Sequence, residues 1–228
     1  MRVWDIDAGF LNDKSLLGEH RELHAIVSIV RHNKRGYAGH PETLRWSRSL
    51  GSLAIRHDLL VEEMLLRGFN HHSPMVKSGE TTAWPSVFID EPDRQYRILQ
   101  GKYVGKSPGR IPLPRTMHNL WASHKYSVMA RDYAAYRDFG RLVAGGNIGI
   151  AELSQALVRV MRTSPPAGSL TNAIFHMWGY VSSFSSLSPT EVPLTALLRE
   201  IQTLALANNV TYLLQSTALG ELAYWCKH

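Results

Sequence analysis

The densest group of ionisable side chains near the start of the chain is Glu19-His20-Arg21-Glu22-Leu23-His24. It places two carboxylates, an arginine and two imidazoles within about two helical turns, shortly after the basic start Met1-Arg2. A carboxylate such as that of Glu22 can transfer protons in acid–base catalysis. An α-amine suits the role of nucleophile, because its ordinary pKa is about 7.7–8.0, against about 10.4 for lysine. These groups together could perform amine-based covalent chemistry.

A metal site is the competing interpretation of the same residues. His20 and His24 are four residues apart and share one helix face. The zinc-protease pattern requires a glutamate directly after the first histidine, but Arg21 stands there. The zinc-deaminase pattern requires two downstream cysteines, and Cys226 is the sole cysteine. The pair His71-His72 is interpreted as a solvated turn, so we expect no metal and no cofactor.

Composition limits the class of protein. The 228 residues are 44% hydrophobic, which is enough for one large or two small domains with a buried core. The net charge of +6 gives mild support for a polyanionic partner. The single cysteine excludes an internal disulfide framework and fits a reducing compartment. No apolar run approaches the ~20 residues that span a bilayer. We expect a cytoplasmic, nucleoid-associated protein that contacts no membrane.

Hydrophobic spacing predicts a mainly α fold. Residues 1–12 form a short arm, after which Asn12 or Asp13 can cap a helix over 15–32. At 100° per residue, Glu22 falls on the flank of the apolar stripe of this helix, which predicts partial burial of its carboxylate. A loop over 33–43 precedes a second long helix over 44–67.

Residues 70–114 are predicted to be irregular. Their last part, 101–114, is rich in glycine, proline and basic residues, so it is either a domain linker or an ordered basic loop on a phosphate backbone. Amphipathic helices are predicted beyond residue 115. Their ranges are 116–131, 133–144, 150–163, 170–184, 193–207 and 211–225.

The segment 31–56 is the most basic part of the chain, with six Lys or Arg residues against one acid, Glu42. A segment of this kind is either a nucleic-acid-binding surface or an ordinary solvated face, and composition does not decide between them. The aromatic residues Tyr37 and Trp46 either stack on bases or belong to the core.

Residues 1–24 resemble the pyrimidine-dimer DNA glycosylase family, which includes phage endonuclease V. The resemblance covers roughly the first 70 residues. It rests on Arg2, Leu11, Leu17, Glu19, Arg21-Glu22-Leu23, Ala38-Gly39-His40 and Arg67-Gly68-Phe69-Asn70.

The resemblance implies a bifunctional DNA glycosylase with abasic-site lyase activity. In that family an N-terminal α-amine attacks the sugar and a glutamate, here Glu22, acts as acid and base. Met1 occupies the position of the first residue, and we expect it to be retained because Arg2 is bulky. The implied nucleic-acid-binding residues, together with those of the basic segment, are Arg2, Arg21, Lys34, Arg35, His40, Arg45 and Arg48.

Two departures from the family leave the substrate base open. Ala25 replaces a basic residue one turn beyond the glutamate, and the aromatic, lysine-rich tail is missing. The expected partner is double-stranded DNA carrying a damaged pyrimidine, with another modified base or RNA as alternatives. Two further alternatives are a non-catalytic nucleic-acid-binding protein and a lyase that uses the side chain of Lys14 or Lys34.

The second half of the chain resembles the YbgA-type helical domain of unknown function. The resemblance rests on two stretches, 124–132 and 136–144, and on Val192-Pro193-Leu194. It implies a helical fold and gives no activity. We therefore expect two domains, a glycosylase-like domain at 1–112 and a YbgA-type domain at 113–228, and the sequence does not predict an oligomeric state.

Overall fold

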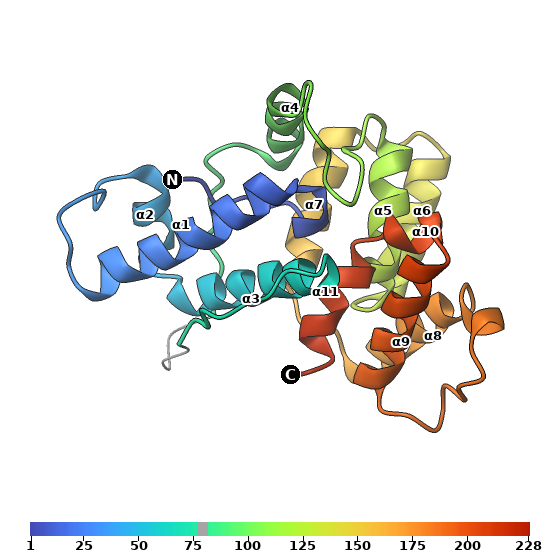
Figure 1. Cartoon of the computed structure of the whole chain (residues 1–228). Helices are drawn as coiled ribbons and strands as arrows, with labels where there is room; N and C mark the ends of the chain where they lie inside the picture. The colour runs from blue at the N-terminus through green and yellow to red at the C-terminus, as the bar shows by residue number, and fades with distance from the viewer. Residues whose placement is uncertain (77–81) are drawn as a thin grey trace.

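The computed structural model describes residues 1–76 and 82–228. Over these residues the chain folds into eleven α-helices and two short 3-10 helices, and contains no strand (Figure 1). The predicted mainly α fold is therefore confirmed. In the same residues no helix combines the length and the apolar character that a membrane crossing requires.

The helices in the first half surround the N-terminal arm, and those of the second half form a bundle around α5. In chain order they are η1 (Ala8–Phe10), α1 (Asp13–Arg31), α2 (Pro41–Trp46), α3 (Leu50–Leu66), α4 (Pro92–Lys102), α5 (Met117–Met129), α6 (Tyr133–Ala144), α7 (Ile150–Met161), α8 (Ala167–Trp178), η2 (Ser182–Phe184), α9 (Leu194–Ala207), α10 (Thr211–Leu214) and α11 (Ala218–Trp225).

The first helix follows the prediction closely. Asn12 caps α1, because its side-chain oxygen accepts a hydrogen bond from the backbone N–H of Ser15 at 3.0 Å. Leu16, Leu23 and Ile26 are completely buried on the predicted apolar stripe. The helix thus presents one face to the core and leaves its flanks available for other functions.

The prediction of a single helix over 44–67 is wrong. The structure has two helices there, α2 and α3, separated by residues 47–49. The hydroxyl of Ser47 donates to the carbonyl of Leu44 at 2.8 Å, and the backbone N–H of Ser49 donates to Trp46 O at 2.9 Å. Such local bonds offer the backbone an alternative to the helical ladder. The division lets α2 turn beside α1.

The prediction of an irregular 70–114 is also wrong in part, because α4 lies within it. Pro92 occupies the first turn, where its missing N–H costs nothing. Tyr96 and Leu99 are buried on one face. The surrounding prolines and glycines conceal this short helix in the sequence.

The segment after α4 packs tightly against the N-terminal arm. Ile111 donates its backbone N–H to Gly9 O at 2.9 Å. The backbone N–H of Asn12 donates to the hydroxyl of Tyr103 at 2.9 Å. A Cβ at Gly109 would lie 2.6 Å from the backbone of Phe10, so only glycine fits. Of the two alternatives, this segment is an ordered loop, and it contacts protein.

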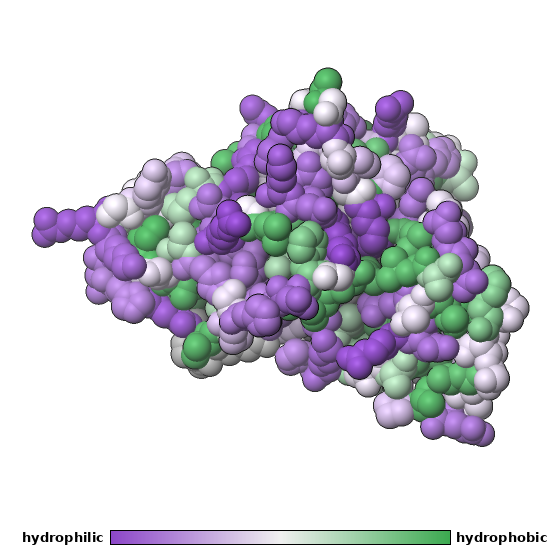
Figure 2. Space-filling view, viewed as in Figure 1, coloured by the Kyte–Doolittle hydropathy of each residue, from purple (hydrophilic) through white to green (hydrophobic). Residues whose placement is uncertain are grey.

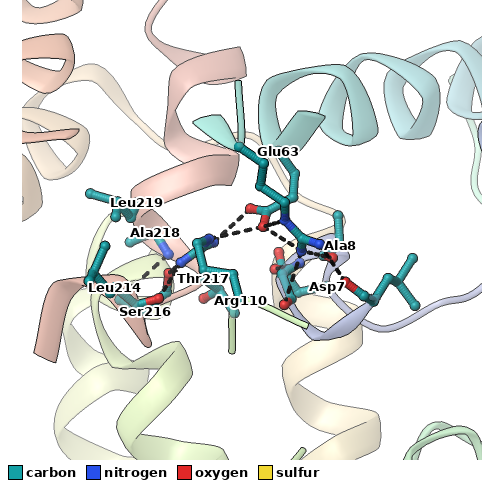
Figure 3. Close-up of polar contacts among 12 residues, drawn as sticks. Asp7, Ala8, Glu63, Arg110, Leu214, Ser216, Thr217, Ala218 and Leu219 are labelled. Carbon is teal, nitrogen blue, oxygen red and sulfur yellow. Dashed lines mark hydrogen bonds and ion pairs between the residues drawn. The ribbon is translucent and has the colours of Figure 1, made fainter. Parts of the chain in front are cut away.

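Arg110 joins this loop to both halves of the molecule. Its guanidinium donates to Glu63 on α3 at 2.6 and 2.9 Å, and to the carbonyls of Leu214 and Ser216 at 2.5 and 3.1 Å (Figure 3). Beside this joint α3 packs against α11, and α4 packs against α7. The two halves therefore share a continuous interior.

In the second half, α5 contacts α6, α7 and α8. Arg131, directly after α5, forms a buried ion pair with Glu221 on α11 at 2.9 Å. The helix predicted over 211–225 is interrupted, because the N–H and hydroxyl of Thr217 both donate to Ser123 O on α5. The helix predicted over 170–184 ends early, because α8 stops at Trp178 and the separate 3-10 helix η2 covers Ser182–Phe184. The remaining predicted helices of this half are present with small shifts at their ends.

Asp7 makes folding stability dependent on pH. Burial, followed by the nearby charges of Glu63 and Glu221, raises the pKa of Asp7 to about 7. In the unfolded chain Asp7 ionises near its ordinary pKa of 3.8. Its contribution to stability is thus fully present below about pH 4 and is lost as pH rises to about 7.

We expect Asp7→Asn to raise Tm at pH 8 by at least about 3 °C and to have a smaller effect at pH 5. The amide keeps an oxygen that can accept the 2.8 Å hydrogen bond from Gly9 N and carries no charge. Thermal unfolding of both proteins at the two pH values measures the difference. An equal change in Tm at both values would contradict the assignment.

Candidate active site and histidine cluster

The N-terminal arm is held through its backbone. Three consecutive N–H groups donate to side chains on three different helices. These bonds are Val3 to Glu42 Oε1 on α2 at 3.1 Å, Trp4 to Glu19 Oε1 on α1 at 3.1 Å, and Asp5 to Gln95 Oε1 on α4 at 2.8 Å. All three acceptor side chains belong to buried residues, so the position of the arm is fixed.

The α-amine of Met1 lies 3.3 Å from His40 Nε2, at the start of α2. The other ring nitrogen, His40 Nδ1, accepts a hydrogen bond from the backbone N–H of Glu42 at 3.1 Å. A neutral imidazole carries one proton, which this bond assigns to Nε2. The contact between Nε2 and the nitrogen of Met1 holds the amine beside the start of α2.

Glu22 is half-buried on α1, as predicted from its position on the flank of the apolar stripe. It follows by three residues Glu19, which holds the backbone of Trp4, and residues at this spacing are neighbours on a helix surface. The N-terminus lies beside α2 and the middle of α1 (Figure 1). Glu22 thus lies about one helical turn from the anchor of Trp4 on α1.

Most of the predicted nucleic-acid-binding residues are accessible. Arg21, Lys34, Arg35 and Arg48 are exposed, whereas His40 is half-buried beside the amine. The loop between α1 and α2 lies at an end of the molecule where hydrophilic residues gather (Figure 2).

The side chain of Arg2, next to Met1 in the chain, is held by two protein contacts. This side chain is 30% exposed, and its guanidinium pairs with Asp90 at 2.5 Å and stacks 4.6 Å from the centre of the Trp4 ring. This side chain is oriented by protein contacts and remains partly open to a ligand.

The prediction that Arg45 contacts nucleic acid is corrected by the structure. Its side chain is 2% exposed and forms ion pairs with Asp5 and with Glu42, the latter at 3.2 Å. Arg56, from the same basic segment, is buried against both carboxylate oxygens of Glu19 at 2.8 and 2.9 Å. A local charge count misses these pairs, because Asp5 and Glu19 lie in other segments.

The structure also brings together four histidines, from α1, α3 and the segment after α3: His20, His24, His57 and His71. Burial, followed by the neighbouring imidazoles, lowers the pKa of His20 to about 4. The same causes lower the pKa of His24 and that of His71. Near neutral pH the rings of His20, His24 and His71 are therefore uncharged. Local spacing within 20–24 could not reveal the cluster; the packing of α1 against α3 was the missing information.

Comparison with known families assigns the two halves separately. Residues 1–77 match the family described as pyrimidine dimer DNA glycosylase. Residues 125–221 match a family described as a protein of unknown function, DUF1722. The expected arrangement of a glycosylase-like segment followed by a YbgA-type segment is thereby confirmed. No curated protein and no solved structure matches the chain significantly.

Proposed function

We propose that the protein is a DNA repair glycosylase with abasic-site lyase activity, acting on double-stranded DNA that carries a damaged pyrimidine. The observation that carries the proposal is the α-amine of Met1, held beside His40 in the segment that matches the glycosylase family. An amine fixed by its own backbone anchors meets the first need of covalent catalysis, which is a positioned nucleophile.

In this mechanism the nitrogen of Met1 attacks C1′ of the damaged nucleotide, and the bond from C1′ to the base breaks. The base leaves with the electron pair and takes up a proton. The C1′–O4′ bond then breaks and the sugar ring opens, O4′ takes up a proton that the attacking amine releases, and an imine remains between Met1 and C1′. Removal of a proton from C2′ then expels the 3′ phosphate, and water hydrolyses the imine to restore the amine.

Glu22 supports two of these steps. As a carboxylate it stabilises the positive charge that develops at C1′, and it then carries protons during imine formation and elimination. His40 positions the amine. The exposed cations Arg21, Lys34, Arg35 and Arg48, together with Arg2, supply phosphate contacts that hold the duplex in register. The damaged nucleotide is turned out of the stack to reach the amine.

Borohydride trapping tests the proposal. Borohydride reduces the imine to a stable amine, so the enzyme becomes covalently attached to an abasic or dimer-containing duplex. We expect Glu22→Gln to reduce the trapping rate by at least about 100-fold with little loss of DNA affinity. Glu152→Gln, an exposed glutamate in the first turn of α7, serves as the matched control.

The result distinguishes the remaining alternatives. Absence of any adduct on dimer, abasic and other damaged duplexes, with DNA binding retained, would overturn the proposal in favour of a non-catalytic binding protein. Trapping that is lost in Lys14→Ala or Lys34→Ala, and survives a blocked N-terminus, would assign the lyase to a side-chain amine. Comparison of duplexes that carry different damaged bases identifies the substrate.

A further inference from the structure

The four-histidine cluster lies where α1, α3 and the segment after α3 meet. His20 and His24 are one turn apart on α1, His57 comes from α3, and His71 follows α3 by five residues. Their ring centres are 4.8 to 5.3 Å apart in five of the possible pairs. The ring nitrogens of these histidines are close to one another as well.

One nitrogen each of His20, His24 and His57 lies within 4.8 Å of the other two. The Nε2 atom of His71 is 3.1 Å from Nε2 of His20. In a tetrahedral zinc site with Zn–N bonds of about 2.0–2.1 Å, the nitrogens are about 3.3 Å apart. The His20–His71 distance already has this value to within a few tenths of an ångström, whereas the nitrogens of His20, His24 and His57 lie up to 4.8 Å apart, so these rings would move inward when an ion binds.

Two nitrogens of the cluster lack a hydrogen-bond partner among the described residues. These are Nε2 of His24 and Nε2 of His57, and both atoms are buried. Buried polar atoms are normally paired, and an orphaned one requires an explanation. A hydrogen bond between His20 and His71 accounts for one atom of each of those rings and leaves the orphaned atoms of His24 and His57 unexplained. A metal ion would pair with all four rings at once.

The surroundings of two rings orient a lone pair inward. Nδ1 of His57 lies 2.9 Å from a carboxylate oxygen of Asp58, so Nδ1–H donates to that oxygen and Nε2 keeps its lone pair. The backbone of Ser73 hydrogen-bonds the ring of His24. Metal-binding histidines typically donate their second ring nitrogen to a carboxylate or a backbone carbonyl in this manner.

We propose that His20, His24, His57 and His71 bind one divalent transition-metal ion of the zinc class. An all-imidazole donor set suits zinc and its neighbours and excludes magnesium and calcium, which prefer oxygen ligands. Four protein ligands leave no open position, so the role is structural. The ion fastens α3 and the segment after it to α1, on whose flank Glu22 lies. This proposal is independent of the glycosylase chemistry.

The test uses the full chain with a removable C-terminal affinity tag that contains no histidines. After dialysis against a chelator, the protein is titrated with Co²⁺ and then with Zn²⁺. We expect one equivalent of Co²⁺ to bind with the intense visible absorption of a tetrahedral site, and Zn²⁺ to abolish that absorption. Free Zn²⁺ at about 100 times Kd should raise Tm by about 5–10 °C.

Variants locate the site. We expect His57→Ala and His71→Ala to weaken Zn²⁺ binding by at least about 100-fold, and Asp58→Asn by about 10–100-fold. His72→Ala, an exposed neighbour of His71, should bind as tightly as the wild type. If His57→Ala fails to fold, the affinity of His71→Ala for Zn²⁺ and the cobalt spectrum of the wild type still test the proposal, because His71 is half-exposed. Weak octahedral cobalt binding in the wild type, or unchanged affinity in His71→Ala, would overturn the proposal.

Discussion

Addition of one residue before Met1 is expected to abolish covalent trapping of abasic DNA, by at least about 10³-fold, and to change duplex affinity by less than about 3-fold. The extension converts the α-amine of Met1 into an amide, whose nitrogen is no longer nucleophilic. It also moves the new amine about 3.3–3.6 Å along the chain, away from the contact with His40 Nε2 at 3.3 Å. Loss of trapping with retained binding would assign the nucleophile to the chain terminus.

The matched control adds the same residue after His228, at the other end of the chain. Intact-mass analysis of each protein establishes which residue is first, because the prediction applies to the chain that begins at Met1. Trapping by the N-terminally extended protein at the rate of the C-terminally extended one would refute the role of the α-amine and leave the fold assignment untouched.

The second large effect is expected from Glu19→Ala. The two oxygens of Glu19 accept from the Arg56 guanidinium at 2.8 and 2.9 Å, and one of them also accepts from Trp4 N at 3.1 Å. Burial raises the pKa of Glu19 and the adjacent Arg56 opposes that rise. Removal of the carboxylate leaves a buried guanidinium without its anion, which typically costs about 3–5 kcal/mol.

We expect this variant to lower Tm by at least about 6 °C, measured by thermal unfolding at pH 7. Asp138→Ala is the control, because Asp138 forms an ion pair with Arg141 in which the side chains are 56% and 75% exposed. An exposed pair of this kind is worth about 0–1 kcal/mol. Similar losses in the two variants would show that the buried pair is not a special determinant of stability.

Local features of the sequence predicted what depends on local contacts. The start of α1 followed from the cap at Asn12, and the half-burial of Glu22 followed from the helical period. The helix ends near 47–49 and 215–217 were missed, because side-chain hydroxyls of Ser47 and Thr217 bond to backbone carbonyls there. Such bonds are set by the packed context as much as by residue type.

The candidate sites were predictable only in part, for the same reason. The sequence places Met1 and Glu22 in one hypothesis because both lie in the segment that resembles a known family. The burial of Arg45 depends on Asp5, forty residues away, and the histidine cluster depends on the packing of α1 against α3. Neither the pairing of Arg45 with Asp5 nor the packing of α1 against α3 can be found from a local charge count or a spacing rule.

The anchoring of the arm by Glu42, Glu19 and Gln95 acts on main-chain N–H groups, which every residue except proline possesses. The location of the first atom is therefore determined by the number of residues that precede Trp4, and hardly by their identity. A change of side chain at position 1 should preserve the geometry, whereas a deletion or insertion there displaces the amine by a whole residue. For this protein, the length of the chain before Trp4 is itself a catalytic parameter under the proposed chemistry.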